Sequence, residues 1–369
     1  MIDTRYLIKS LNEKGINFFC GVPDSVLKNI SNILENYKDS NHIVASNEGS
    51  AVGIGAGYYL SKKKIPAIYM QNSGLGNAIN PLTSICHPKV YSIPMLLIIG
   101  WRGAPKVKDE VQHQVMGKIT RNLLKLINVK FCILSQKKDF KKLFKLINYS
   151  KKKSRPVACI IKNKTLDKVK KRTKYKKKNL GLKRIDFISE LLSNLKKKDR
   201  IIATTGYTSR ELFQLRQLKK KNKGKDFYMV GGMGHTSSVS LGFALSSKRC
   251  RTICLDGDGS LLMHMGALGS AGLYGKSNFK YILLNNGTHE SVGGQKTISR
   301  KINFKKLAKN LNFKNYYYVK KKSSIKVKLN NFLKIKGPSF LEVKIEEGTI
   351  QNLVRPKSLI NIKKSFIKK

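Results

Sequence analysis

Apolar residues along this chain alternate between short unbroken runs and longer stretches with helical spacing. The runs predict strands over 17–21, 42–45, 66–70 and 95–99, and again over 200–203, 251–255, 279–284 and 339–345. Between them, the helical spacing predicts helices over 5–14, 26–37, 48–60 and 76–85, and then over 185–196, 209–218, 236–245 and 261–273. Strands that are apolar throughout and separated by helices form parallel sheets covered on both faces. We therefore expect an α/β fold.

A basic, polar stretch interrupts this alternation from about residue 163 to residue 184 and is nearly devoid of large apolar side chains. Such a composition is typical of a linker. We predict two α/β domains of similar size, over 1–165 and 185–369, joined by a linker over 166–184. Within the first domain, Gly53, Gly55 and Gly57 should let the helix over 48–60 pack closely on its neighbours.

Composition is consistent with a folded protein in the cytoplasm. Of the 369 residues, 41% are hydrophobic, which is ample for buried cores. No apolar run reaches the roughly 18 to 20 residues that span a bilayer, and the residues after Met1 show no signal-peptide pattern, so we expect no export. The cysteines form no CxxC pair, which favours buried free thiols over a metal site.

The formal net charge of +53 raises the possibility of a nucleic-acid partner. The excess, however, is mostly lysine in solvated runs such as 62–64, 151–153, 176–178, 219–221 and 320–322. No RNP, KH or zinc-finger pattern and no aromatic interleaving accompanies these runs. We regard nucleic-acid binding as unsupported, although a positive field would help to attract anionic substrates.

The segment Asp256-Gly257-Asp258-Gly259-Ser260 carries the clearest chemistry. It follows an apolar strand and opens a helix, whose N-terminus favours phosphate, and its glycines let backbone approach a ligand closely. Asp258 supplies a hard oxygen ligand at that point, and the next apolar strand ends at Asn285-Asn286. Because adjacent parallel strands bring their carboxyl ends together, these groups could hold a magnesium ion that bridges two phosphates.

A GDG segment followed by NN in this arrangement resembles the motif of the thiamine-diphosphate enzyme superfamily. The resemblance implies two thiamine-diphosphate-binding domains, with Gly257, Asp258, Gly259, Ser260 and Asn286 at the cofactor. It also implies that Asp258, Asn286 and the Thr288 carbonyl bind Mg²⁺.

Two further segments are similar to the same superfamily. The loop Gly231-Gly232-Met233-Gly234 implies that Met233 supports the bent cofactor and that the Gly231 carbonyl accepts from its amine. In Ala45-Ser46-Asn47-Glu48-Gly49, Glu48 would bind the pyrimidine nitrogen and activate the cofactor. The resemblance implies at least a homodimer, with sites at the subunit interface.

Most of the chain resembles the phosphonopyruvate decarboxylases and the related sulfopyruvate decarboxylases. The matching segments are 21–25, 72–77, 100–103, 108–110, 112–113, 205–211 and 285–295. The resemblance implies decarboxylation of phosphonopyruvate to phosphonoacetaldehyde, in phosphonate biosynthesis such as that of 2-aminoethylphosphonate. Sulfopyruvate enzymes usually divide the two domains between separate chains, so the fused form favours phosphonopyruvate.

Substrate contacts are expected from three residues of the first domain. Asp24 and Ser25 lie in a strand-to-helix turn that could bind an anion, and Arg102 is a candidate partner for substrate charge. His113 is the first candidate for the proton donor that follows decarboxylation. The other candidates for that role, all close to the cofactor motifs, are His235, His264 and His289.

Three alternatives stay open at this point: sulfopyruvate decarboxylation, a thiamine-dependent carboligation such as acetolactate formation, and a polyanion-binding module on a decayed enzyme scaffold. Decay should have removed Glu48, Asp258 or Asn286, and all three are present.

Overall fold

A computed structural model describes residues 1–169, 181–218, 225–247 and 250–367. The chain divides into two compact units, Met1–Tyr175 with Val292–Gln295, and Lys176–Ser291 with Lys296–Lys369. Of the predicted linker, residues 170–180 lie outside the described residues. Its first residues are fastened to the first unit, because Leu166 pairs with Ile2 and the Asp167 carboxylate accepts from Thr4.

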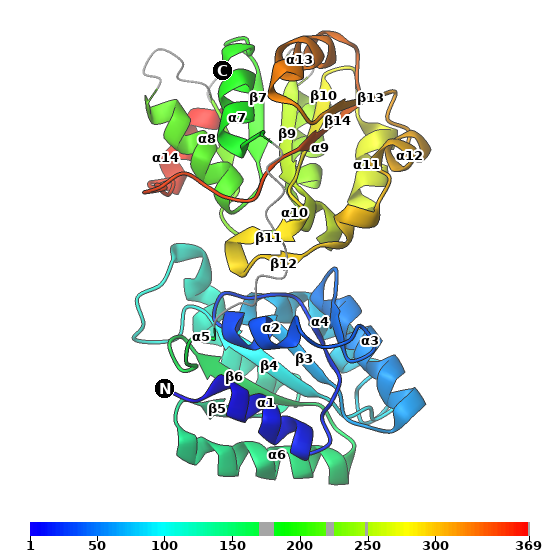
Figure 1. Ribbon diagram of the computed structural model, residues 1–369, viewed down its shortest axis with the longest axis vertical. Helices are drawn as coiled ribbons and strands as arrows, with labels where there is room; N and C mark the ends of the chain where they lie inside the picture. The colour runs from blue at the N-terminus through cyan, green and yellow to red at the C-terminus, as the bar shows by residue number, and fades with distance from the viewer. Residues whose placement is uncertain (170–180, 219–224, 248–249, 368–369) are drawn as a thin grey trace. The chain divides into compact units, whose positions relative to one another are not determined.

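The first unit contains a six-stranded sheet in which the paired strands are parallel (Figure 1). Its strands are β1 (Phe19–Gly21), β2 (His42–Val44), β3 (Ala67–Gln71), β4 (Leu96–Trp101), β5 (Lys130–Leu134) and β6 (Val157–Lys162). They lie in the order β2-β1-β3-β4-β6-β5. The order reverses beside β1, and the carboxyl ends of strands at such a switch point are where open α/β sheets bind ligands.

Helices cover both faces of this sheet. They are α1 (Thr4–Glu13), α2 (Lys28–Leu34), α3 (Glu48–Lys62), α4 (Leu75–Thr83), α5 (Val111–Leu126) and α6 (Phe140–Lys153). One buried cluster joins α1, α2 and α6 to one side of the strands, and a second joins α3, α4 and α5 to the other. The apolar side chains therefore alternate between two cores, as the unbroken hydrophobic runs predict.

The second unit repeats this strand order. Its six-stranded sheet consists of β7 (Arg200–Ala203), β8 (Phe227–Tyr228), β9 (Thr252–Gly257), β10 (Phe279–Asn285), β13 (Asn315–Val319) and β14 (Ser339–Lys344). The order is β13-β14-β10-β9-β7-β8, with parallel pairing throughout. Read from β8, it matches the first sheet strand for strand. Two short strands, β11 (Thr288–His289) and β12 (Gln295–Lys296), lie outside it.

Two buried clusters also flank this second sheet. The helices are α7 (Arg184–Ser193), α8 (Tyr207–Leu218), α9 (Thr236–Ser246), α10 (Asp258–Met263), α11 (Gly266–Tyr274), α12 (Phe304–Asn310), α13 (Ile325–Lys334) and α14 (Leu359–Ile367). Helices α7, α8 and α13 contribute to one cluster, and α9 to α12 to the other. The predicted α/β fold class, with two such units, is confirmed.

Two local expectations were wrong. The helix predicted over 261–273 is divided, because His264 leaves the helical conformation between α10 and α11. Of the three glycines expected to pack closely in α3, only Gly55 does so, since a Cβ there would lie 2.6 Å from the Ile68 side chain, whereas Gly53 and Gly57 have open space beside them. Among the described residues, no helix is both long enough and apolar enough to cross a membrane.

Phe340 on β14 should be a main contributor to the stability of the second unit. Its buried ring stacks on Tyr281 at 5.1 Å and meets Phe313 edge-on at 5.4 Å. We expect Phe340→Ala to lower the free energy of unfolding by about 3–5 kcal/mol, because it removes the ring and leaves a cavity. Urea denaturation measures this loss. Val327→Ala, at a 64% exposed position, is the control, and an equal loss there would contradict the interpretation.

Candidate active site

Glu48 begins α3, directly after β2, and its side chain is buried. Asn47 caps the helix by accepting from the Ser50 backbone at 2.8 Å, which holds this turn in place. The Asn77 amide donates to Glu48 Oε2 at 2.7 Å, and Gly74 lies so close that a Cβ there would overlap the carboxylate. Burial raises the pKa of Glu48 and the bond from Asn77 opposes that shift, so the carboxyl group can take up a proton more readily than an exposed glutamate.

Asp24 follows β1 and is fully enclosed by its own turn and by β4. Its Oδ2 accepts from the backbone N–H groups of Val26 and Leu27 at 2.9 and 3.2 Å. A Cβ at Gly100 would overlap the carboxylate. Burial raises the pKa of Asp24 to about 6 despite the nearby Arg102 charge, and Oδ1 is buried with no hydrogen-bond partner among the described residues.

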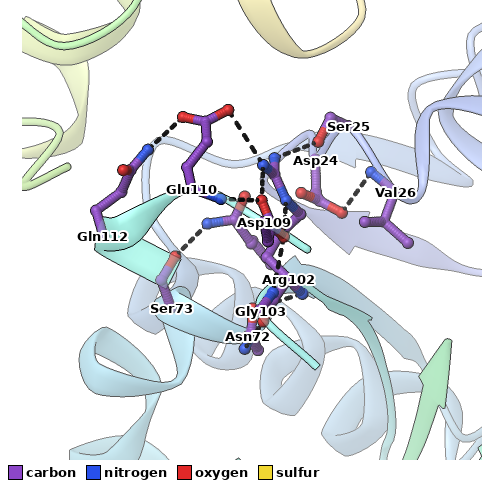
Figure 2. A network of polar contacts seen from close by, with 11 residues as sticks. Asp24, Ser25, Val26, Asn72, Ser73, Arg102, Gly103, Asp109, Glu110 and Gln112 are labelled. Carbon is purple, nitrogen blue, oxygen red and sulfur yellow. Dashed lines mark hydrogen bonds and ion pairs between the residues drawn. The ribbon is translucent and has the colours of Figure 1, made fainter. Parts of the chain in front are cut away.

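Arg102 follows β4 and is the centre of a polar network (Figure 2). Its guanidinium binds the Asp109 carboxylate through Nε at 2.8 Å and Nη2 at 2.6 Å. Nη1 donates to Ser25 Oγ at 2.9 Å, and Nη2 also reaches Glu110 at 3.4 Å. Asn72 fixes the Arg102 backbone on both sides, through bonds of 2.9 and 3.1 Å. The structure thus brings Ser25 and Arg102 into direct contact.

Carboxylates surround Arg102, whereas a simple anion site would have an excess of positive charge. One guanidinium faces the carboxylates of Asp109, Glu110 and Asp24. Although burial alone would raise the pKa of Asp109, hydrogen bonds from Arg102 and Gly103 hold that pKa below its usual value. An anion that binds this guanidinium must compete with a carboxylate, and Glu110, at 3.4 Å, is held less closely than Asp109, at 2.6 Å.

His113 lies in the first turn of α5 next to this network. Its ring can come within 4.8 Å of the carboxylate oxygens of Asp109 and Glu110. Burial and the Arg102 charge lower the pKa of His113 to about 4, so the free enzyme holds a neutral imidazole at neutral pH. A bound dianionic substrate would raise this pKa, because negative charge favours the imidazolium.

In the second unit, Asp258 begins α10 at the carboxyl end of β9 and is buried. Hydroxyl groups of Thr297 and Ser299 donate to its Oδ2, the latter at 2.7 Å. Burial raises the pKa of Asp258, whereas these donors, the Lys344 charge and the Asn286 backbone N–H oppose the shift. The pKa therefore stays raised, but these partners reduce the cost of a charged carboxylate in a buried place.

Asn286 and Thr288 follow β10, the neighbour of β9, as expected from the strand ends. Asn286 Oδ1 accepts from the Thr288 backbone at 3.0 Å, and its Nδ2 donates to Glu290 at 3.0 Å. Thr288 Oγ1 is buried without a hydrogen-bond partner among the described residues. A carboxylate, an amide oxygen and a backbone carbonyl gathered at one sheet edge form a donor set that suits Mg²⁺.

The glycine loop 231–234 lies against this same edge. The Gly234 backbone donates to Ser260 Oγ at 3.1 Å, and Thr204 also donates to that oxygen at 2.9 Å. A Cβ at Gly259 would lie 3.5 Å from the Met233 methyl and 2.8 Å from His289. Gly231, Gly232 and Gly234 have positive φ, which explains the need for glycine in this turn.

The remaining candidate histidines lie around this loop. His235 and His264 stack with their ring centres 4.5 Å apart, and His264 Nε2 is buried without a partner among the described residues. His289 is buried next to Gly259, and burial lowers its pKa to about 4. Within the described part of the chain, no hydrogen bond or ion pair singles out one of them as a proton donor.

A cavity of about 380 Å³ opens next to this site in the second unit. It shares Asn285 and Ser299 with the hydrogen-bond network of Asp258, and Lys344 and Glu342 also line it. Neither the 257–260 turn nor the 231–234 loop contributes to its wall, so this cavity is not the predicted cofactor cradle.

Several residues of these networks did not follow from sequence reasoning. Asn77, Asp109 and Glu110 lie in segments that resemble known decarboxylases, but their roles as partners of Glu48 and Arg102 were not foreseen. Thr297 and Ser299 carry no motif, and Glu290, although it lies in the matching segment 285–295, was given no role. Only the fold brings them to Asp258 and Asn286.

Family models match both units. Residues 4–122 match the "Thiamine pyrophosphate enzyme, N-terminal TPP binding domain", and residues 204–343 match the "Thiamine pyrophosphate enzyme, C-terminal TPP binding domain". The first match covers Glu48 and the Arg102 network, and the second covers Asp258 and Asn286. The predicted cofactor, thiamine diphosphate, is confirmed at the level of the family.

Curated relatives extend over nearly the whole chain. Phosphonopyruvate decarboxylase from Streptomyces viridochromogenes is 31% identical over 97% of this chain and 92% of its own length. Sulfopyruvate decarboxylase from Methanosarcina acetivorans is 29% identical over 93% of this chain and 91% of its own length. Among solved structures, benzoylformate decarboxylase from Polynucleobacter necessarius covers 95% of this chain with 12% identity and a TM-score of 0.39, too low to support an argument.

The family models and the full-length relatives support the same classification, which agrees with the polar groups found at the strand ends. The chain belongs to the thiamine-pyrophosphate enzymes, as a 2-oxo acid decarboxylase of the family that includes the phosphonopyruvate and sulfopyruvate decarboxylases.

Proposed function

We propose that this enzyme decarboxylates phosphonopyruvate to phosphonoacetaldehyde and CO₂, with Mg²⁺ as the metal, in phosphonate biosynthesis such as that of 2-aminoethylphosphonate. The observation that carries the proposal is the match, at 31% identity over 97% of the chain, to a relative named for this substrate. The Arg102 network adds support, because it offers a guanidinium and a serine hydroxyl, both of which suit a phosphonate.

Sulfopyruvate is the second candidate substrate. A sulfopyruvate decarboxylase matches this chain over 93% of its length, so the presence of both domains in one chain does not separate the two substrates. Phosphonate and sulfonate are both tetrahedral oxyanions. They differ in charge near neutral pH, where a phosphonate can carry a second negative charge. The carboxylates around Arg102 would repel that second charge, so they bear on which of the two substrates binds.

The second unit would hold the cofactor's diphosphate and its cation. Asp258, Asn286 and the Thr288 carbonyl would bind Mg²⁺, and the close approach of Gly259 and the N-terminus of α10 suit the phosphates. Met233 would support the thiamine, and the Gly231 carbonyl would accept from its amine. When bound, thiamine diphosphate supplies the electron sink for the pair left by departing CO₂.

The first unit would contribute the groups that move protons. Glu48, with a pKa raised by burial, would share a proton with the cofactor's pyrimidine ring, while Asn77 keeps the carboxylate oriented. Replacing CO₂ by hydrogen at the carbonyl carbon then requires one proton. We propose His113 as its donor, with a pKa raised by the bound substrate; His235, His264 and His289 are the competing candidates.

We also propose that the enzyme is at least a homodimer. On α5, Val111, Val115 and Ile119 repeat at helical spacing on one side and are 57%, 68% and 41% exposed. An apolar stripe of this kind supports burial against a second chain. Sedimentation or mass photometry of the purified protein tests the proposal, which a monomer with full activity would contradict.

We expect cofactor-dependent CO₂ release from purified protein to be fastest with phosphonopyruvate. Each assay compares phosphonopyruvate, sulfopyruvate and pyruvate, with and without added Mg²⁺ and thiamine diphosphate. Faster release from sulfopyruvate would reassign the substrate within the family, and no release from any oxo acid despite bound cofactor would contradict decarboxylation.

Gly74→Ala should lower turnover by about 10²-fold or more, because the new Cβ would displace the Glu48 carboxylate, whose proton transfer contributes a factor of this order. Glu48→Gln should have the same effect while leaving cofactor binding largely intact. The measurements are kcat with phosphonopyruvate and thiamine diphosphate affinity by calorimetry.

Gly76→Ala is the matched control for this prediction. It makes the same substitution two positions later, where a Cβ would have nothing within 4 Å. Wild-type turnover in Gly74→Ala or Glu48→Gln would reject the role assigned to Glu48.

Charge substitutions around Arg102 should shift KM for phosphonopyruvate in opposite directions. Arg102→Gln should raise KM about 10-fold or more, the effect of losing one charge-assisted hydrogen bond. Glu110→Gln should lower KM, because it removes the carboxylate that competes with the substrate for Nη2. Pyruvate, which lacks the phosphonate, should respond much less to either change.

Glu13→Gln controls for the change in net charge, since Glu13 is an exposed acid of the same unit. It should leave KM unchanged. An unchanged KM in Arg102→Gln, or a raised KM in Glu110→Gln, would rule out Arg102 as the phosphonate partner.

A further inference from the structure

Glu290 is a shared acceptor beneath the candidate cation site of the second unit. Its Oε2 accepts from Asn286 Nδ2 at 3.0 Å and from Arg184 Nη2, while its Oε1 accepts from the Gly348 backbone. The bond to Asn286 thus attaches a candidate metal ligand to the ion pair between half-buried Glu290 and buried Arg184. Nothing in the sequence pattern around Glu290 indicates this role.

Arg184 holds Glu290 in place from the opposite side. Its side chain is only 5% exposed, and it also binds Glu211 Oε1 at 3.3 Å and the Gly348 carbonyl at 3.2 Å. Glu211, which is 1% exposed, accepts in turn from the Thr349 hydroxyl at 2.7 Å. Because breaking a buried ion pair is costly, Glu290 has little freedom to leave Asn286.

This arrangement decides which end of the Asn286 amide faces the cation site. With Nδ2 directed to a carboxylate, Oδ1 must point the other way, where it accepts from the Thr288 backbone at 3.0 Å. A carbonyl oxygen has a second lone pair, which remains for a cation. A flipped amide would set its NH₂ against the Thr288 N–H and its oxygen against the Glu290 carboxylate, so both contacts would become repulsive.

The turn between Asn286 and Thr288 is also held by Arg300. Arg300 Nε donates to the Gly287 carbonyl at 3.0 Å, and Gly287 has a φ of 73° with the Arg300 side chain where a Cβ would stand. The backbone of the turn and the amide of Asn286 are therefore constrained independently, by Arg300 and by Glu290.

We propose that Glu290 is a positioning residue for the divalent cation: it orients Asn286 so that Oδ1 serves as the ligand, and Arg184 keeps Glu290 in place. This inference rests on the proposed function, because it takes Asn286 as a ligand of the cation. It assigns to Glu290 an effect on metal affinity that acts through Asn286, without contact between Glu290 and the metal.

The test is Mn²⁺ binding to the full-length protein, measured by electron paramagnetic resonance at one fixed concentration of thiamine diphosphate. Glu290→Ala should weaken Mn²⁺ affinity about 10-fold or more, as the loss of a residue that orients a metal ligand typically does. Glu290→Gln should stay within about 3-fold of wild type, because its amide oxygen can still accept from Asn286. Both variants lose the ion pair with Arg184, so both should have a lower Tm.

Asp226→Asn is the matched control for stability. It breaks another buried ion pair of the same unit, in which Arg216 Nε lies 2.6 Å from Asp226. It should lower Tm and leave Mn²⁺ affinity unchanged. Wild-type affinity in Glu290→Ala, with a Tm loss like that of Asp226→Asn, would reduce Glu290 to a structural role and overturn the proposal.

Substitutions that change charge but keep the side-chain size test the same pair, Asn286 and Glu290. Asn286→Asp should weaken Mn²⁺ binding, because the new carboxylate is repelled by Glu290, and adding Glu290→Gln should restore affinity by supplying a donor. Absence of that rescue would overturn the pairing. Failure of wild-type protein to bind Mn²⁺ would instead overturn the cation site itself, and the proposed use of a metal with it.

Discussion

Parallel pairing of strands that are apolar on both faces is the constraint on which the rest of this structure depends. A parallel strand must return through a crossover, and both faces of its sheet must be covered. In each unit the same strand order results, with helices on two sides and separate buried clusters. Apolar side chains therefore fill most strand positions, although Lys280 and Glu342 are buried within β10 and β14, and the candidate site residues lie at the carboxyl ends.

Those polar side chains are nevertheless buried, and their partners determine their chemistry. Burial raises the pKa of Glu48, Asp24 and Asp258 alike, but at Asp258 two hydroxyl donors and the Lys344 charge oppose that shift. A carboxyl group that is easily protonated suits proton exchange with a cofactor. One surrounded by donors suits a cation. In the proposed function, the two units would use the same type of residue, at the same kind of strand end, for different tasks.

If Arg102 binds the substrate as proposed, the choice of substrate would depend on a local balance of charge. Arg102 attracts an anion, and the acids bound to it oppose that attraction. The chain's large positive charge does not bear on this balance directly, because it is carried largely by solvated lysine runs. In that proposal, a few carboxylates next to one guanidinium would have more influence on the choice between a phosphonate and a sulfonate than the net charge of the protein.

The sequence by itself determined the α/β class, the alternation of elements, and the residues at strand ends, because hydrophobic periodicity and local turns depend on residues close together in the sequence. Asp258 and Asn286 could be paired in advance, since adjacent parallel strands end together. The tertiary structure alone decided that Asn77 binds Glu48, that Asp109 binds Arg102, and that Glu290 joins Arg184 to Asn286. Arg184 and Glu290 are distant along the chain, and no local pattern encodes a contact that depends on how crossovers place two loops against each other.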